Sequence, residues 1–484
     1  MFDEGRRMKI TRLVALVALA AGSVMPLSTH AGAAASATLL TLPTPNKGLF
    51  EGFLPAFACT SSGNCIAGGA YSDGSNNQQG VLYSELDGTW QAGVALLPPQ
   101  GASTPNPAIT LYDGACGAAG SCSVLGTFND HAGNGQALVA DQVNGSWTRA
   151  RALVMPSDAL GAQLQVQPRA ITCWSAGNCV AVGTYNASTM FTEQGFLATE
   201  HSGTWQAAQR VSLPADQGLN PLVALNQVAC WGTGSCAAVG SYVDANGVTN
   251  AIIVPRAGGT WRPAQVVVLP ARSSAYAGAT LNEITCSLTF CTAVGSFTTL
   301  AGSQQPMALT RNTRGWLPAV QVAMPTIAAA NPTPFYWGYA GISCASAGNC
   351  SFGGNYLNKS GYHQGFLANE VNGVWQTATT LKLPAGALYA GANGGVIADS
   401  CTAVGNCTAA AAFVNASKQY QAMLITETNN VWGSPSIVTL PNNAATVGVN
   451  GGIYGLACFA TLGCEVSGSY LVSGSTYEGF TARL

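Results

Sequence analysis

The chain has 484 residues, of which 58 are glycine and only 8% are charged, and its formal net charge at pH 7 is −2. Few charges with many small residues are typical of an all-β protein rich in turns rather than of a helical one. Lysine and arginine form no cluster after residue 35. This excludes nucleic-acid binding as an expected function, because such proteins carry a clustered basic surface.

Residues 1–35 have the pattern of an export signal peptide. Lys9 and Arg12 give a basic start, residues 13–27 form an apolar run, and small residues around Ala33 form a cleavage site. The apolar run is too short for a comfortable membrane span, and no later stretch qualifies as one. We expect a secreted or periplasmic protein, cleaved near Ala33, with no membrane span in the mature chain.

Sixteen cysteines fall into eight close pairs, and successive pairs begin 56 to 58 residues apart. A fixed period of this size indicates a propeller, a solenoid or an array. The pairs are Cys59 and Cys65, Cys116 and Cys122, Cys173 and Cys179, Cys230 and Cys236, Cys286 and Cys291, Cys344 and Cys350, Cys401 and Cys407, and Cys458 and Cys464.

We interpret each pair as one disulfide across a tight hairpin, because turn-forming residues separate the two cysteines and the chain is expected to be exported. The rival interpretation is a metal site. The spacing is not Cys-x-x-Cys, and the four histidines of the chain do not accompany the pairs. We expect no metal ion and no cofactor.

Within one period the sequence predicts four strands. In the third period, residues 180–185 form an apolar run after the second cysteine, residues 195–199 form a second run, and a turn leads to Trp205. The last strand ends at Leu213-Pro214, where proline terminates pairing. Four antiparallel strands joined by short loops form a propeller blade. A tryptophan recurs at this register, and we expect it to pack between neighbouring blades: Trp90, Trp147, Trp205, Trp261, Trp316, Trp375 and Trp432.

The two ends of the chain complement each other. The eighth period stops at residue 484 after its third strand, whereas residues 37–43 match a fourth strand that belongs to no following blade. We therefore expect residues 36–484 to form an eight-bladed β-propeller of four-stranded antiparallel blades, with the N-terminal strand closing the last blade. Closure would hide the sheet edges that an open array leaves exposed.

The segments ITCWSAGNCVAVGTY (171–185) and SCASAGNCSFGGNY (343–356) resemble the S-C-x-S-x-x-x-C-x-A-V-G-x-Y repeats of exported bacterial β-propeller proteins. In outline, the repeat is also similar to kelch blades, which carry a glycine doublet such as Gly353-Gly354. The resemblance covers residues 37–484. It implies the fold and export, and it implies no catalytic motif.

The long connections are the expected location of a binding site, because binding usually uses variable loops on a rigid scaffold. The connection richest in aromatic residues contains Phe335, Tyr336, Trp337 and Tyr339. Exposed, these side chains would stack on sugar rings or anchor a partner; alternatively, some begin the next strand and pack in the core. Tyrosines in comparable connections could extend the surface: Tyr112, Tyr276, Tyr389 and Tyr454.

Polar residues precede several of the first cysteines and would line a central channel: Asp113, Arg169, Asn226, Gln227, Asn282, Glu283 and Asp399. Asp113 and Glu283 share one register and are weak catalytic candidates, since a carboxylate pair can hydrolyse glycosides. The alternative is that both are solvated residues at the channel mouth.

The sequence therefore favours a binding or interaction module that recognises an extracellular glycan or protein and is expected to be a monomer. A carbohydrate-active enzyme, hydrolase or lyase, and a structural envelope protein remain the alternatives. Sparse charge with eight cross-links also predicts tolerance of acid.

Overall fold

A computed structural model describes residues 36–484, except 161–164, 188–191, 277, 288, 335–340, 390–394, 446–451, 461–462 and 475. Residues 1–35, which contain the expected signal peptide, lie outside this range. The fold is a β-propeller built from repeats, which we number 1 to 8 by their cysteine pairs. Apart from the short 3₁₀ turn η1 (Phe50–Gly52), the described elements are strands.

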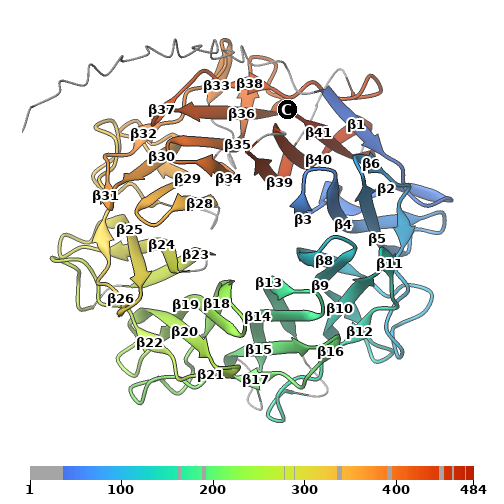
Figure 1. The fold of residues 1–484 in the computed structure, drawn as a ribbon, viewed down its shortest axis with the longest axis horizontal. Coiled ribbons are helices and arrows are strands. Elements are labelled where there is room, and N and C mark those ends of the chain that lie inside the picture. The colour runs from blue at the N-terminus through green and yellow to red at the C-terminus, as the bar shows by residue number, and fades with distance from the viewer. Residues whose placement is uncertain are drawn as a thin grey trace, which may run out of the picture. The chain divides into compact units, whose positions relative to one another are not determined.

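The first strand of each repeat lies nearest the centre in Figure 1, and the fourth lies at the periphery. The first strands are β3 (Ala56–Ser61), β8 (Thr110–Ala118), β13 (Val166–Ser175), β18 (Ala224–Gly232), β23 (Ala279–Ser287), β28 (Gly341–Ser346), β34 (Val396–Ala403) and β39 (Gly452–Phe459). The second strands are β4 (Asn64–Asp73), β9 (Ser121–Asn129), β14 (Asn178–Asn186), β19 (Ser235–Val243), β24 (Phe290–Thr298), β29 (Asn349–Leu357), β35 (Asn406–Asn415) and β40 (Gly463–Ser473).

The third strands are β5 (Gln78–Leu86), β10 (Gly135–Val143), β15 (Glu193–His201), β20 (Thr249–Ala257), β25 (Gln304–Asn312), β30 (His363–Val371), β36 (Tyr420–Thr428) and β41 (Thr476–Arg483). The sequence predicts one continuous fourth strand, but the structure divides it into two short pieces that both pair with the third strand. These are β6 (Thr89–Trp90) with β7 (Val94–Ala95), β11 (Ser146–Trp147) with β12 (Arg151–Ala152), β16 (Thr204–Trp205) with β17 (Gln209–Arg210), β21 (Thr260–Trp261) with β22 (Gln265–Val266), β26 (Gly315–Trp316) with β27 (Val320–Gln321), β31 (Val374–Trp375) with β32 (Thr379–Thr380), and β37 (Val431–Trp432) with β38 (Ser436–Ile437).

Over the described residues, the strands form seven sheets of antiparallel strands. Six belong to repeats 2 to 7, and the sheet of repeat 7 also contains β33 (Ala387–Tyr389). The seventh joins repeat 8 to repeat 1, because β2 (Asn46–Leu49) pairs with both β41 and β4. The N-terminal strand β1 (Ser36–Leu40) pairs with β41, from Ser36 opposite Arg483 to Leu40 opposite Gly479. This is the pairing that the sequence predicts for the two ends.

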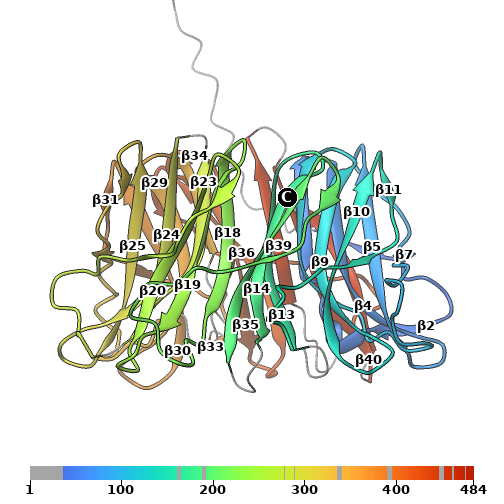
Figure 2. The ribbon, with the colours of Figure 1, turned by 90° about the horizontal axis from the view of Figure 1, so that it is seen from below.

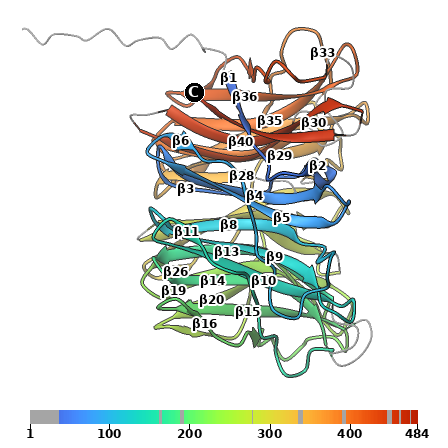
Figure 3. The same cartoon turned by 90° about the vertical axis from the view of Figure 1, so that its right-hand side faces the viewer.

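Each first strand contacts the first strand of the next repeat, and β39 of repeat 8 contacts β3 of repeat 1. Figure 2 shows β18, β19 and β20 of one repeat side by side. In Figure 3, the second strands β40, β4, β9 and β14 follow one another from repeat 8 to repeat 3.

The core lies between neighbouring sheets. Leu125 and Val139 of repeat 2 pack against Ala181 and Phe196 of repeat 3, and equivalent clusters recur around the molecule. Because both faces of a second strand are covered in this way, its middle is mostly apolar, as the Val-Ala-Val sequence at residues 180–182 illustrates. Apolar burial on both faces of each sheet is the main stabilising contribution.

A disulfide forms within every one of the eight cysteine pairs, as the sequence predicts. The two cysteines of each pair occupy directly opposed positions of the first and second strands. The bonds are Cys59–Cys65, Cys116–Cys122, Cys173–Cys179, Cys230–Cys236, Cys286–Cys291, Cys344–Cys350, Cys401–Cys407 and Cys458–Cys464. The connectivity is therefore entirely local, within one hairpin of each repeat.

The two cysteines of a pair differ in burial, which their spacing does not indicate. Every first cysteine is half-buried, because it lies on the innermost strand. Every second cysteine is buried, because it lies on the second strand, which neighbouring sheets cover on both faces; these residues are Cys65, Cys122, Cys179, Cys236, Cys291, Cys350, Cys407 and Cys464. The second cysteines thus belong to the hydrophobic core and offer no surface for a ligand, so the disulfides have a structural role.

The cysteine hairpin also contacts the hairpin between strands three and four of its own repeat. In repeat 1 the N–H of Gly88 donates to the carbonyl of Gly63 at 2.9 Å. The N–H of Gly145 makes the equivalent contact with Gly120 in repeat 2. These two tight hairpins therefore share one face of the propeller, which we call the hairpin face.

Candidate functional site

A β-bulge in the first strand places two adjacent side chains on its exposed side. In repeat 4, Leu225 lies opposite Gly240 and Gln227 lies opposite Val239, so Asn226 is the inserted residue. Gly240, the glycine of the A-V-G-x-Y sequence, allows this close approach, since a Cβ atom there would lie 1.8 Å from the carbonyl oxygen of Ala224. The bulge re-aims the side chains beside it.

The same bulge occurs four residues before the first cysteine in repeats 2, 3, 4, 5, 7 and 8. We call the residues three and four positions before each first cysteine the axial register. In repeats 2 to 5 it contains Tyr112 and six of the polar residues that the sequence singled out. These side chains are exposed or half-buried: Tyr112, Asp113, Arg169, Asn226, Gln227, Asn282 and Glu283.

Asp113 is held by backbone groups of two repeats. One carboxylate oxygen accepts the N–H of Gly114 at 2.8 Å, and the other accepts the N–H of Ile171 in repeat 3 at 2.9 Å. Burial raises the pKa of Asp113 to about 7, although these two hydrogen bonds oppose the shift. Asp113 therefore connects neighbouring first strands, and both of its oxygens are occupied.

Glu283 is less constrained. It accepts one hydrogen bond, from the side-chain amide of Gln227 in repeat 4 at 3.2 Å. Burial raises the pKa of Glu283 to about 8; Gln227 opposes this shift, and repulsion by Asp113 adds to it. The two acids are thus close enough to interact electrostatically although they come from repeats 2 and 5.

The amide of Asn226 also crosses between repeats, since it donates to the carbonyl of Leu281 at 2.7 Å. Polar contacts therefore join the first strands of repeats 2 and 3, and those of repeats 4 and 5. These groups can donate and accept hydrogen bonds, while their backbone is fixed by neighbouring sheets.

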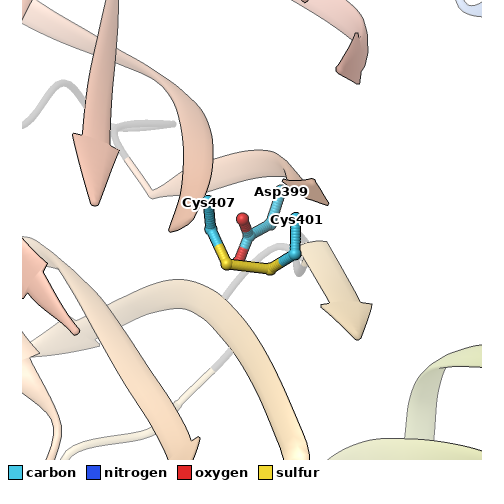
Figure 4. A group of neighbouring side chains, drawn as sticks. All are labelled: Asp399, Cys401 and Cys407. Atoms are coloured by element: carbon cyan, nitrogen blue, oxygen red, sulfur yellow. A yellow bond between two sulfur atoms is a disulfide. The ribbon is translucent and has the colours of Figure 1, made fainter. Parts of the chain in front are cut away.

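Asp399 has a different environment from Asp113 and Glu283. It lies two residues before Cys401, is 9% exposed, and burial raises its pKa to about 8. Its carboxylate and the sulfur atoms of Cys401 and Cys407 lie within 4.8 Å of one another (Figure 4). The two sulfurs are bonded to each other, so neither is a thiolate, and the group does not fit a metal ion in the oxidised protein.

The predicted aromatic binding residues Phe335, Tyr336, Trp337 and Tyr339 lie outside the described residues. Of the tyrosines proposed to extend that surface, Tyr276 is 89% exposed and Tyr112 is 41% exposed. Tyr454 instead packs beside Phe53, with ring centroids 5.6 Å apart, and its hydroxyl donates to the carbonyl of Gly52. The side chain of Tyr389 is not among those described.

The tryptophans of the fourth strands contact the preceding repeat, as a packing role between blades requires. The indole N–H of Trp147 donates to the hydroxyl of Ser84 at 3.1 Å, and that of Trp205 donates to the carboxylate of Asp141 at 3.2 Å. Trp261 and Trp432 make equivalent contacts.

A cavity of about 310 Å³ lies between the outer strands of repeats 6 and 7. Trp432 and Lys382 are among its lining residues, but the Lys382 ammonium donates to the carbonyl of Trp432, and the indole donates to Asn369. These lining groups are engaged with one another, so they serve the packing of the two repeats.

Sequence reasoning missed one register. The residue of the third strand that pairs with the tryptophan is charged or an amide in all seven repeats that have the tryptophan. The signal was present in the sequence, five residues before each tryptophan: Glu85, Gln142, Glu200, Arg256, Arg311, Glu370 and Glu427.

No protein-family model and no curated protein sequence matches the chain. Among solved structures, a polysaccharide lyase of family PL25, an ulvan lyase, is 9% identical, with a TM-score of 0.46, over 92% of this chain and 96% of that one. An α-L-arabinanase of Penicillium chrysogenum is 13% identical, with a TM-score of 0.35, over 68% of this chain and 96% of that one.

The sialidase Hz136, described as a Hadza microbial enzyme, is 11% identical, with a TM-score of 0.37, over 76% of this chain and 74% of that one. These identities and scores assign no activity to this chain. In the described part of the chain, no helix has the length and hydropathy needed to cross a membrane. With sixteen cysteines paired in eight disulfides, the protein suits an oxidising, extracellular compartment.

Proposed function

We propose that residues 36–484 form a closed, eight-bladed propeller that is exported after removal of residues 1–35. The cyclic contacts of the eight first strands support closure, as does the pairing of β1 with β41. A closed ring leaves no exposed sheet edge for aggregation, and eight disulfides suit an oxidising compartment.

We infer further that this monomeric propeller binds an extracellular glycan at the axial register. The observation that carries this inference is the bulge, which presents two adjacent polar side chains in each of repeats 2, 4 and 5. Amide, guanidinium and carboxyl groups on a rigid wall hydrogen-bond hydroxyl groups, and Tyr112 supplies an aromatic ring beside them.

The aromatic residues at 335–339 extend this proposal. They precede Gly341, which occupies the axial register of repeat 6. In the sequence they come directly before the first strand of repeat 6. We propose that they contribute stacking surface to the same glycan.

A carbohydrate-active enzyme is the second candidate, and a specific observation favours it. Asp113 and Glu283 interact electrostatically, and a pKa of about 7 or 8 would keep a carboxyl group protonated as a general acid near neutral pH. Against catalysis, both oxygens of Asp113 accept backbone N–H groups, which leaves it poorly placed to act as a nucleophile or base.

The test is a glycan array followed by titration calorimetry of each bound glycan. Asn282→Ala and the double variant Tyr336→Ala, Trp337→Ala should each weaken binding about tenfold or more, the loss expected for one or two well-placed contacts. Gln91→Ala is the control, because the Gln91 side chain is exposed and donates to the carbonyl of Thr89 in its own turn. Absence of glycan binding by the wild type, or unchanged affinity in both variants, would overturn the proposal.

The glycans that bind can also be used to distinguish a binding module from a carbohydrate-active enzyme. Each is incubated with the wild type and with Glu283→Gln, and chain cleavage is followed by size-exclusion chromatography. A binding module leaves every chain intact. Cleavage by the wild type that Glu283→Gln abolishes while binding persists would establish the enzyme instead.

A further inference from the structure

Repeats 4 and 5 carry arginine at the register that pairs with the tryptophan. Arg256 pairs with Trp261, and Arg311 pairs with Trp316. Repeats 1, 3, 6 and 7 carry glutamate at this register and repeat 2 carries Gln142. The two adjacent repeats therefore reverse the charge of this position, where Arg256 is buried and Arg311 is half-buried.

Each of these arginines lies over a tryptophan of the preceding repeat. The guanidinium of Arg256 is 5.0 Å from the ring centroid of Trp174, and that of Arg311 is 4.1 Å from the ring centroid of Trp231. Both tryptophans directly follow the first cysteine of their hairpin. The other six repeats have no tryptophan there, but Thr60, Gly117, Ser287, Ala345, Thr402 and Phe459. Arginine and tryptophan thus occur together, twice, at one interface.

Neither guanidinium has an acidic partner among the described residues. Arg256 is only 5% exposed, and its Nε and Nη1 atoms are buried without a hydrogen-bond partner. Arg483, near the end of the third strand of repeat 8, contrasts with them because it pairs with Glu85 and Glu465. A buried, unpaired cation is costly, and an indole offsets only part of that cost. An anion would complete the interaction.

Two tight turns of the hairpin face lie over the guanidinium of Arg256. A Cβ atom on Gly234 would lie 3.2 Å from Nη1 of Arg256, and one on Gly259 would lie 4.0 Å from Nη2, so the guanidinium lies directly beneath the two turns. The turn above it is Gly258-Gly259, which is exposed and carries no side chain. In repeat 5 the corresponding turn carries Arg314, which adds a further positive charge beside Arg311.

We propose that Arg256 and Arg311, each stacked on an indole, are two subsites on the hairpin face for the anionic groups of a polyanionic polysaccharide. Guanidinium donates charge-assisted hydrogen bonds to carboxylate and sulfate oxygens alike, so both groups fit. Two equivalent subsites on adjacent repeats match a polymer whose charges repeat along its length. These subsites are built from residues that the axial register does not use, so they do not depend on the proposed function.

The test is calorimetric titration of the full mature chain with polygalacturonate, dextran sulfate and uncharged dextran. Polygalacturonate supplies carboxylates and dextran sulfate supplies sulfate esters, so the two distinguish the source of the anion. We expect at least one polyanion to bind, binding to weaken as salt is raised, and dextran not to bind. Arg256→Gln and Arg311→Gln should each weaken binding at least about tenfold, as expected when a charge-assisted contact is lost.

Glutamine suits the substitution because Gln142 occupies this register in repeat 2. Arg210→Gln is the charge-matched control: Arg210 is exposed and pairs with Asp158 elsewhere in repeat 3, so this variant should bind like the wild type. Thermal unfolding with the disulfides intact verifies that each variant folds. Tryptophan fluorescence reports directly on the two subsites. Sodium sulfate added at constant ionic strength should change the fluorescence of the wild type and leave that of the double arginine variant unchanged.

Three results would overturn the proposal. One is that neither polyanion binds. Another is that Arg256→Gln and Arg311→Gln alter the melting temperature while leaving polyanion affinity unchanged, which would make the Arg–Trp pairs purely structural. The third is that Asn282→Ala abolishes polyanion binding, which would place the polymer at the axial register. If Asn282→Ala loses only the binding of neutral glycans, the result bears on the proposed function and does not contradict the two arginine subsites.

Discussion

Arg483 donates from Nη2 to the carboxylate of Glu85 at 3.0 Å, although the two residues are 398 positions apart in the chain. Its Nε also donates to Glu465 of repeat 8. The charged contact thus joins the last strand of the chain to its first repeat, beside the pairing of β1 with β41. Both acids are almost fully buried, whereas the arginine is half-exposed.

Arg483→Gln should destabilise the protein by about 1–3 kcal/mol, because it leaves two buried carboxylates without their cation. Burial and, to a smaller extent, repulsion by Glu465 raise the pKa of Glu85 to about 7, and Arg483 opposes this shift. The variant should therefore raise that pKa. Denaturant unfolding with intact disulfides measures the stability.

Arg210→Gln serves as the comparison for the Arg483 substitution. The pair of Arg210 with Asp158 is more exposed, and surface pairs contribute at most about 1 kcal/mol. Equal losses in Arg483→Gln and Arg210→Gln would show that the contact between the chain ends has no special importance.

Stability should increase as the pH falls from about 8 toward about 4.5. Burial raises the folded-state pKa of Asp113 to about 7 and those of Glu283 and Asp399 to about 8. Unfolded carboxyl groups titrate near 4, so between these values the folded state binds more protons. The stability from these groups is fully present below about pH 4 and is lost as pH rises through 7 to 8.

Aspartates in the turns limit how far the stability of the protein persists as the pH falls. Hydrogen bonds to Asn77 lower the pKa of Asp73, and the backbone N–H of Val248 lowers that of Asp244. Their contribution is present above about pH 4 and is lost as pH falls through their folded values. Denaturant unfolding at pH 5 and pH 8, at one ionic strength, measures whether the carboxyl groups of raised pKa or the turn aspartates dominate the change in stability. A protein less stable at pH 5 than at pH 8 would contradict it, and Glu283→Gln with Asp399→Asn should flatten the dependence.

Removal of one disulfide should have a modest effect. The cysteines of a pair are five or six positions apart, and closing so short a loop stabilises by about 2 kcal/mol in the chain-entropy model. The double variant Cys173→Ser, Cys179→Ser should therefore fold with stability lower by about that amount. Peptide mapping without reduction should find no cross-link between different repeats. Misfolding of the double variant would show that the disulfide is required to set the hairpin register.

Gly240→Ala should be severely destabilising, by about 3 kcal/mol or more, because the added Cβ would lie 1.8 Å from the carbonyl oxygen of Ala224. Gly232→Ala is the matched control in the same repeat, since a Cβ there would meet no atom within 4 Å. It should change stability by less than about 0.5 kcal/mol. Similar thermal unfolding of both variants would contradict the role assigned to the A-V-G glycine.

Much of the fold could be predicted because the same sequence pattern recurs in every repeat. The cysteine period, the tryptophan register and the terminal half-match at residues 37–43 each follow from spacing alone, and the structure forms the disulfides and the β1–β41 pairing accordingly. The division of the fourth strand, for example into β16 and β17, and the insertion of β2 between β41 and β4 depend on pairing geometry that no residue type marks.

The candidate site was only partly predictable. Asp113 and Glu283 were identified from their register, but their hydrogen bonds to Ile171 and Gln227 depend on how neighbouring repeats approach each other. The Arg256–Trp174 contact likewise joins residues 82 positions apart (256 minus 174), and each residue alone suggests only core or surface. Spacing within one repeat carries no information on such contacts.

The bulge beside Gly240 has an evolutionary consequence. It presents two neighbouring positions whose side chains bear little of the packing, while Leu225 next to them is fully buried. Substitutions at these positions therefore alter the binding surface without a large loss of stability. Repeated copies can diverge there independently after duplication, so one scaffold can acquire new specificities by point mutation while its hydrophobic interior stays unchanged.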